Sequence, residues 1–227
     1  MSDKKRYFEL VAQYPQRFVN VPGGIDILLD PVLIAQAEAQ VAQQLIARGL
    51  PPEWAEVGVA FQDAYLLMLR DAVRFPNGAL GTYFRITSME ADIPGVAILP
   101  IYQGKIVLER HYRHGSREWL IEIPRGYGEA GFTPEENARR ELMEEIGAAV
   151  IRIEPLGNIQ LNASSWGGYD ALFFAELATL GKLDAAEGIS NLLLVDKAQF
   201  QEMIATGAIT DGFTLCAYAR AVAKNLW

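Results

Sequence analysis

A helix with marked ends, predicted between Thr133 and Gly147, constrains this chain more than any other stretch. Thr133 suits the N-cap, Pro134 suits the first helical position, and Glu136 completes a capping box with Thr133. Gly147 ends the pattern, because glycine readily takes the left-handed conformation that closes many helices. These signals predict a helix of about three to four turns with defined limits.

Glutamates gather on the second half of this helix. At about 3.6 residues per turn, Glu141 and Glu145 share one face, and Glu144 lies beside Glu141. Because like charges at this spacing destabilise an isolated helix, we expect a cation among them. Mg²⁺ or Mn²⁺ suits such a site, since these ions are held by a few carboxylates together with substrate phosphate. A solvated acidic helix face is the alternative interpretation.

The stretch from Gly126 to Ala148 resembles the Nudix box of the Nudix hydrolases, written G-x5-E-x7-R-E-U-x-E-E-x-G-U with U aliphatic. Gly126 matches the first glycine, and the run from Arg140 to Gly147 matches the end of the box with the right spacing. Two positions depart from it. Phe132 stands where the first glutamate belongs, and Ala148 takes the last aliphatic place. In the family, that glutamate helps to orient the box arginine or the metal ligands.

The resemblance implies which groups would hold a metal ion. Glu141 and Glu145 are the main expected ligands. Glu144 would share the site, and the backbone carbonyl of Gly131 would complete it. Arg140 would pair with a carboxylate and hold it in place. Divalent ions there would neutralise a diphosphate, orient it and lower the pKa of a bound water.

A catalytic base is expected in a loop well past the box. In the ADP-ribose pyrophosphatase branch of the family, a loop glutamate often takes the proton of the attacking water. Glu187 occupies a similar place and is the candidate base, with Asp184 in reserve. The two histidines, His111 and His114, have no evident carboxylate partner in the sequence, and we expect both to be surface or strand residues.

Binding of a phosphorylated substrate must rely on single arginines, because the formal net charge is −8. Arg113 falls where the branch has a phosphate-contacting arginine, and a guanidinium suits bidentate contact with phosphate oxygens. Arg85 and Arg125 are weaker candidates. Trp166, in a loop of small residues, is a candidate for recognition of a base or choline, and a packing role is the alternative.

Composition narrows the class of protein further. Non-specific nucleic-acid binding is unlikely for a chain with 20 basic and 28 acidic side chains, since it needs a basic surface. Cys216 is the only cysteine, which excludes an intrachain disulfide and a cysteine-rich zinc site. The chain shows neither a signal peptide nor the ~20 consecutive apolar residues of a membrane-spanning helix, so we expect it to be cytoplasmic.

Hydrophobic periodicity predicts an α/β protein in two parts. Residues 1–56 form a small helical N-terminal extension, and the resemblance implies a Nudix α/β/α sandwich with a mixed sheet over residues 57–227. Helices are expected at residues 5–14, 32–48, 133–147, 197–206 and 214–225. Strands are expected at residues 64–70, 73–75, 81–86, 96–102, 105–113, 119–123, 149–153, 169–177 and 191–195.

The wider resemblance narrows the substrate. Residues 95–100, 110–113 and 119–124 are similar to segments that precede the box in ADP-ribose pyrophosphatases. We therefore predict a Mg²⁺-dependent pyrophosphohydrolase that cleaves the diphosphate of a nucleoside diphosphate linked to another group, with ADP-ribose as first choice. The N-terminal extension looks more like a Nudix group that hydrolyses CDP-choline, so CDP-choline or a nucleotide sugar is the alternative substrate.

Two non-enzymatic interpretations stay open. One is a catalytically weakened nucleotide-binding module, because Phe132 replaces the first box glutamate. The other is an interaction protein built on the N-terminal helices. A homodimer is expected, since the apolar stripe of Leu33, Val41 and Leu45 needs a surface to pack on and the ADP-ribose branch often dimerises.

Overall fold

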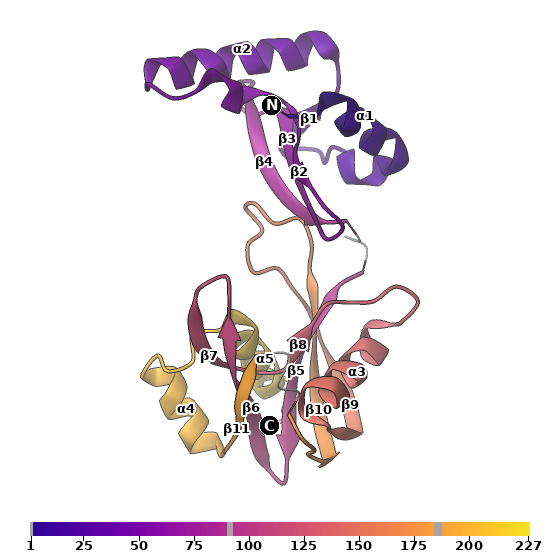
Figure 1. The fold of residues 1–227 in the computed structure, drawn as a ribbon, viewed down its shortest axis with the longest axis vertical. Coiled ribbons are helices and arrows are strands. Elements are labelled where there is room, and N and C mark those ends of the chain that lie inside the picture. Colours follow the sequence, from indigo (N-terminus) through magenta and orange to yellow (C-terminus); the bar gives the residue numbers. More distant parts are fainter. Residues whose placement is uncertain (1, 90–92, 184–187) are drawn as a thin grey trace. The chain divides into compact units, whose positions relative to one another are not determined.

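The computed structural model describes residues 2–89, 93–183 and 188–227. The chain divides into two compact units (Figure 1). Unit 1 comprises Met1–Ala91 and Asn162–Gly167, and unit 2 comprises Asp92–Leu161 and Gly168–Trp227. Within the described residues, no helix is long and apolar enough to cross a membrane.

Unit 1 is a small sheet with helices packed on it. Its elements are α1 (Lys4–Gln13), η1 (Pro15–Phe18), β1 (Asp26–Leu28), α2 (Pro31–Ala47), η2 (Pro52–Ala55), β2 (Gly58–Gln62), β3 (Leu66–Arg74) and β4 (Leu80–Ser88). Strand β3 is central: β4 pairs along its length, whereas β2 and β1 pair with successive parts of it, all antiparallel.

The domain boundary expected at residue 57 differs from this division. Strands β2 to β4, which we assigned to the Nudix sandwich, belong with the N-terminal helices. The reason is packing, because Tyr7 of α1 and Ile34 of α2 share one buried hydrophobic cluster with Leu67 and Leu69 of β3. Alternation along a strand reveals its buried face but does not say which sheet it joins.

Unit 2 is built on a larger mixed sheet. Its elements are β5 (Gly95–Tyr102), β6 (Lys105–Arg113), β7 (Glu118–Glu122), β8 (Arg125–Gly126), α3 (Pro134–Ile146), β9 (Ala149–Ile159), β10 (Asp170–Thr179), β11 (Ile189–Val195), α4 (Lys197–Ala205) and α5 (Gly212–Ala223). The strand order is β11-β6-β5-β10-β9, with β7 on β6 and β8 on β5. Strands β5 and β10 run parallel, and the other pairs are antiparallel.

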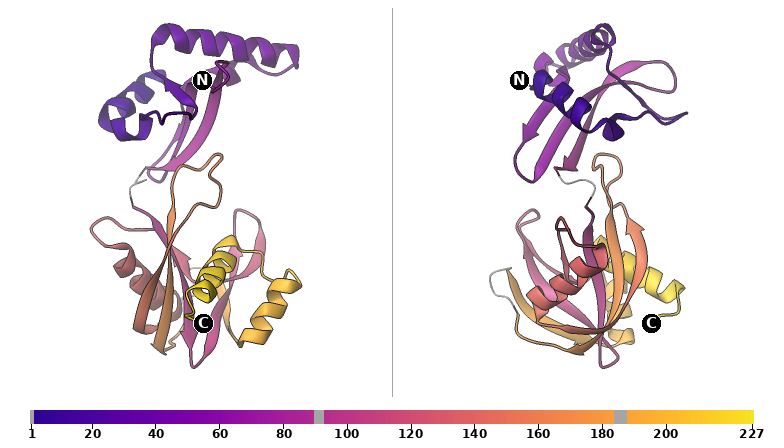
Figure 2. Two further views of the ribbon diagram at one scale, coloured as in Figure 1. Left: turned by 180° about the vertical axis from the view of Figure 1, so that it is seen from behind. Right: turned by 90° about the vertical axis from the view of Figure 1, so that its right-hand side faces the viewer.

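Helices cover both faces of this sheet, which confirms the predicted α/β/α sandwich (Figure 2). Residues of β5 alternate between two cores: Val96 and Ile98 pack with Leu142 of α3, whereas Leu99 packs with Phe213 of α5. A strand buried on both faces reads as a continuous apolar run, which is the pattern that the sequence shows here.

The predicted helices and strands of unit 2 are confirmed to within a few residues, apart from β9. This strand continues past the expected end at Ile153, through Pro155 and Gly157, to Ile159. It tolerates them because it lies at the edge of the sheet and is bulged where it faces Leu172 and Phe173. In unit 1, β1 and β2 were not expected, and the two runs at 64–75 form one strand.

Candidate active site

Helix α3 begins and ends as predicted. Thr133 accepts a hydrogen bond from the Glu136 amide, the Glu136 carboxylate accepts one from the Thr133 amide at 2.7 Å, and Gly147 closes the helix with φ of +60°. Leu142 is buried against the sheet. Some carboxylates of α3 therefore face the core and others face the solvent. Glu141, Glu145 and Glu144 each have different neighbours.

Glu141 lies against β8. A Cβ atom on Gly126 would overlap the carboxyl group of Glu141, so only glycine at this position leaves room for it. This contact gives a physical reason for a glycine at the start of the motif. Strand β8 pairs Gly126 with Val96 of β5, and this pairing fixes the backbone against which the Glu141 carboxylate lies.

Glu145 is nearly buried, with 4% of its surface exposed. One of its oxygens accepts a hydrogen bond from the Arg125 amide at 3.2 Å. Burial raises the pKa of Glu145 to about 9, and the nearby carboxylates of Glu109 and Glu141 add to the rise. Without a cation, this carboxyl group therefore prefers to hold a proton.

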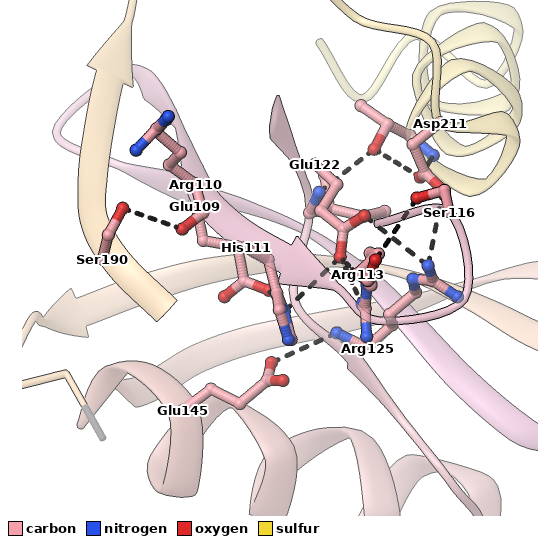
Figure 3. A network of polar contacts seen from close by, with 12 residues as sticks. Glu109, Arg110, His111, Arg113, Ser116, Glu122, Arg125, Glu145, Ser190 and Asp211 are labelled. Carbon is pink, nitrogen blue, oxygen red and sulfur yellow. Dashed lines mark hydrogen bonds and ion pairs between the residues drawn. The ribbon is translucent and has the colours of Figure 1, made fainter. Parts of the chain in front are cut away.

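A buried polar cluster on β6 and β7 was missed by the sequence analysis. Glu109, His111 and Glu122 are all buried, and the ligand atoms they offer lie within 4.8 Å of one another. The Nδ1 atom of His111 lies 3.1 Å from Glu109 Oε1 and 3.5 Å from Glu122 Oε1 (Figure 3). The expectation that His111 lacks a carboxylate partner was wrong.

Strand geometry assembles this cluster. Glu109 and His111 are two residues apart on β6, and side chains at that spacing point to the same face. The β6–β7 register places Glu122 directly opposite Glu109. The spacing of two residues could have indicated the contact of His111 with Glu109 from the sequence. The contact of His111 with Glu122 depends on the register between β6 and β7.

Two arginines surround Glu122. Arg113 Nε donates to Glu122 Oε1 at 2.7 Å, and Arg125 Nη2 lies 3.5 Å from Glu122 Oε2. Arg125 also lies 3.8 Å from Asp211 Oδ1 and stacks over the ring of Phe213. The side chains of Arg113 and Arg125 remain 25% and 26% exposed, although Nη2 of Arg113 and Nε of Arg125 are themselves buried.

Arg140 pairs with carboxylates on the outer side of α3. It donates to Glu129 at 2.8 Å and to Glu144 at 3.2 Å. Its guanidinium group also lies over the Phe132 ring, 4.8 Å from the centroid. Gly131, in the turn before the helix, has φ of +88°, a conformation that favours glycine.

Other predicted residues lie in unit 1 or outside the described residues. Arg85 of β4 donates to Asp71 at 2.6 Å in a buried ion pair, which engages its guanidinium group. Trp166 is 38% exposed and forms a bridge with Ile86, and its role in substrate recognition stays a prediction. The expected base Glu187 and its reserve Asp184 lie outside the described residues.

Residues 92–203 match the protein family described as the NUDIX domain. The matched residues form a NUDIX domain. The match begins at the first residue of unit 2.

A solved structure described as "Crystal structure of ADP compounds hydrolase" is similar to this chain, with a TM-score of 0.65 and 18% sequence identity. The alignment covers 74% of this chain and 90% of that one. At this identity the likeness supports the Nudix fold alone. The comparison with curated proteins gave no match.

The two departures from the Nudix box have different surroundings. Phe132 replaces a carboxylate, yet Arg140 still has carboxylate partners in Glu129 and Glu144. Ala148 is buried in the core under α3, where its small side chain serves the same packing role as a larger aliphatic one.

The carboxylates of the Nudix domain fit a divalent cation. Gly126 leaves open the space in which the Glu141 carboxylate lies. Glu145 is buried among negative groups, and Oε2 of Glu109 is a buried atom with no hydrogen-bond partner in the described chain. Carboxylate oxygens are the donors that Mg²⁺ and Mn²⁺ prefer, and a buried charge without a partner is costly.

Proposed function

We propose that this chain is a metal-dependent Nudix pyrophosphohydrolase that cleaves the diphosphate of a nucleoside diphosphate linked to another group. ADP-ribose is the first choice of substrate and Mg²⁺ or Mn²⁺ the cofactor. The observation that carries the proposal is the buried Glu145 carboxyl group, which lies near the charges of Glu141, Glu109 and Arg113 and accepts a hydrogen bond from the Arg125 amide. The structural neighbour is described as an ADP compounds hydrolase, which makes an ADP compound the first substrate to test.

The carboxylates and the arginines would act on the diphosphate in different ways. Glu141 and Glu145 would hold the divalent ion. When bound, the ion neutralises the diphosphate and lowers the pKa of the attacking water. Arg113 and Arg125 would bind phosphate oxygens, and their shared contact with Glu122 holds them in position before substrate arrives.

Removal of a proton from the attacking water needs a further group. Glu187 remains our candidate base, because its place in the sequence after the box is similar to that of the glutamate in the ADP-ribose branch, and Asp184 is the reserve. The carboxylate oxygen that accepts this proton must be ionised at neutral pH. An ordinary loop carboxylate meets that condition.

A substrate panel tests the proposal. The full chain is incubated with ADP-ribose, CDP-choline and a nucleotide sugar, each with and without Mg²⁺, and released monophosphates are quantified. We expect AMP from ADP-ribose at the highest rate, and only with metal. Faster release of CMP from CDP-choline would select the alternative substrate, and no turnover of any compound would overturn the proposal.

A non-catalytic nucleotide-binding module is the second candidate, and Phe132 is the observation that favours it. It predicts that ADP-ribose raises the melting temperature without any product. Restoring the carboxylate with Phe132→Glu separates the two functions. A weakened enzyme gains rate, whereas a binding module stays without product.

A further inference from the structure

Two buried carboxylates in the Nudix domain, those of Glu109 and Glu122, differ in how well neighbouring groups bind their oxygens. Glu109 and Glu122 are both fully buried. Glu122 contacts the guanidinium groups of Arg113 and Arg125. Glu109 Oε1 contacts His111, but its Oε2 is buried and has no hydrogen-bond partner among the described residues. Such an atom costs free energy unless something binds it.

Glu109 lies on the face of β6 that packs under α3, because Val107, two residues earlier on the strand, shares a buried cluster with Leu142 and Ile146. Its charge is the second largest cause of the raised pKa of Glu145, after burial itself. Burial also raises the pKa of Glu109. The buried carboxyl groups of Glu109 and Glu145 therefore lie on the same side of the sheet, one on β6 and one on the Nudix box helix.

His111 fixes the orientation of Glu109. Its Nδ1 atom lies within 3.5 Å of oxygens of both Glu109 and Glu122, which are opposite one another on β6 and β7. The contact occupies Oε1 of Glu109 and leaves Oε2 for another ligand. Figure 3 shows the side chains of His111 and Glu145 pointing toward one another from β6 and α3.

We propose that Glu109, from outside the Nudix box, is a ligand of the divalent ion held by Glu145. This inference rests on the proposed metal-dependent function. It accounts for the loss of a carboxylate at Phe132 and for the pairing of Glu144 with Arg140, because β6 supplies a ligand in their place. Water and phosphate oxygens complete the coordination.

Binding of Mn²⁺ without substrate tests the inference directly. Its affinity and stoichiometry are measured by electron paramagnetic resonance and calorimetry on the full chain, with Glu109→Gln, Glu141→Gln and the exposed control Glu202→Gln. We expect Glu109→Gln to weaken Mn²⁺ binding by at least ~10-fold. Glu202→Gln should bind as wild type. Wild-type affinity in Glu109→Gln, with loss in Glu141→Gln, overturns the assignment of Glu109 but not the proposed function.

Thermal unfolding distinguishes two roles for Glu109: a ligand of the metal ion and a structural partner of His111. If Glu109 is a metal ligand, the Glu109→Gln variant should melt no lower than wild type in chelator, because a buried charge is gone. The variant should also lose most of the Mn²⁺-induced rise in melting temperature. A lower melting temperature in chelator with the Mn²⁺-induced rise intact overturns the inference. Absence of Mn²⁺ binding by wild type overturns the proposed function, and this inference with it.

Discussion

Glu145 is the side chain whose ionisation most depends on what occupies the site. Burial, together with its carboxylate neighbours, raises its pKa to about 9, and the Arg125 amide stabilises the ionised form only in part. A divalent cation favours the ionised carboxylate and so lowers that pKa. Metal binding and deprotonation of Glu145 are therefore linked.

Neutral substitutions in the box should remove activity. We expect Glu141→Gln and Glu145→Gln each to lower kcat/KM for the best substrate by more than ~100-fold, because an amide is a poor metal ligand and even groups that support a ligand matter 10–100-fold. Metal-dependent release of monophosphate measures the effect, with Glu202→Gln as control. A silent variant would show that the carboxylate holds no metal.

Stability of the metal-free protein should fall with rising pH. The pKa of Glu145 is 4.5 in its ordinary state and about 9 in the fold, so the folded state holds a proton that the unfolded state has lost. This contribution is complete below about pH 4.5 and disappears as pH rises toward 9. Melting temperatures in chelator should decline more steeply for wild type than for Glu145→Gln. An equal decline of melting temperature with pH in both proteins would contradict the raised pKa of Glu145.

The ends of α3 could be predicted from the sequence, whereas the side-chain contacts of β6 with β7 could not. The ends of α3 depend on Thr133, Glu136 and Gly147, which interact within the helix itself, so local signals were sufficient. The cluster on β6 depends on Glu122 of β7, a partner set by strand register. Register follows from the whole sheet, and spacing along one strand does not determine it.

Strand β8 is short, but it determines where Glu141 can lie. Gly126→Ala should displace the Glu141 carboxylate and lower kcat/KM by about 100-fold, as expected for a misplacement of about 1 Å at a reacting centre. The far-ultraviolet circular dichroism should stay unchanged. Gly115→Ala, which adds a Cβ to open space, is the matched control. Full activity in Gly126→Ala would mean that Glu141 is not held there.

For the whole molecule, packing of the N-terminal helices was the part that sequence could not assign. The stripe expected to need a partner is half-buried within unit 1, and Leu33 packs on the unit 1 core. Val32 and Ile46 of α2 are 64% and 61% exposed. Whether a helix packs on its own sheet or on a second subunit depends on tertiary contacts that periodicity does not encode.

The expected homodimer is tested by the mass of the protein in solution. Size exclusion with light scattering should give twice the chain mass of 25.1 kDa, concentrated or dilute. Val32→Glu with Ile46→Glu should yield a monomer if these exposed residues form the interface, since buried unpaired charges are costly. A mass of 25.1 kDa for wild type would make the monomer the working enzyme.

Residues 162–167 belong to unit 1 although the chain on either side belongs to unit 2. The Ile86 amide donates to Ser165 at 2.7 Å, and the Gly167 amide donates to Ile86 at 2.8 Å. The chain therefore passes between the units at residues 91–92, 161–162 and 167–168. A chimaera made by one crossover at residue 92 would pair β4 with a foreign loop, so recombination that exchanges whole units must join the gene at three places.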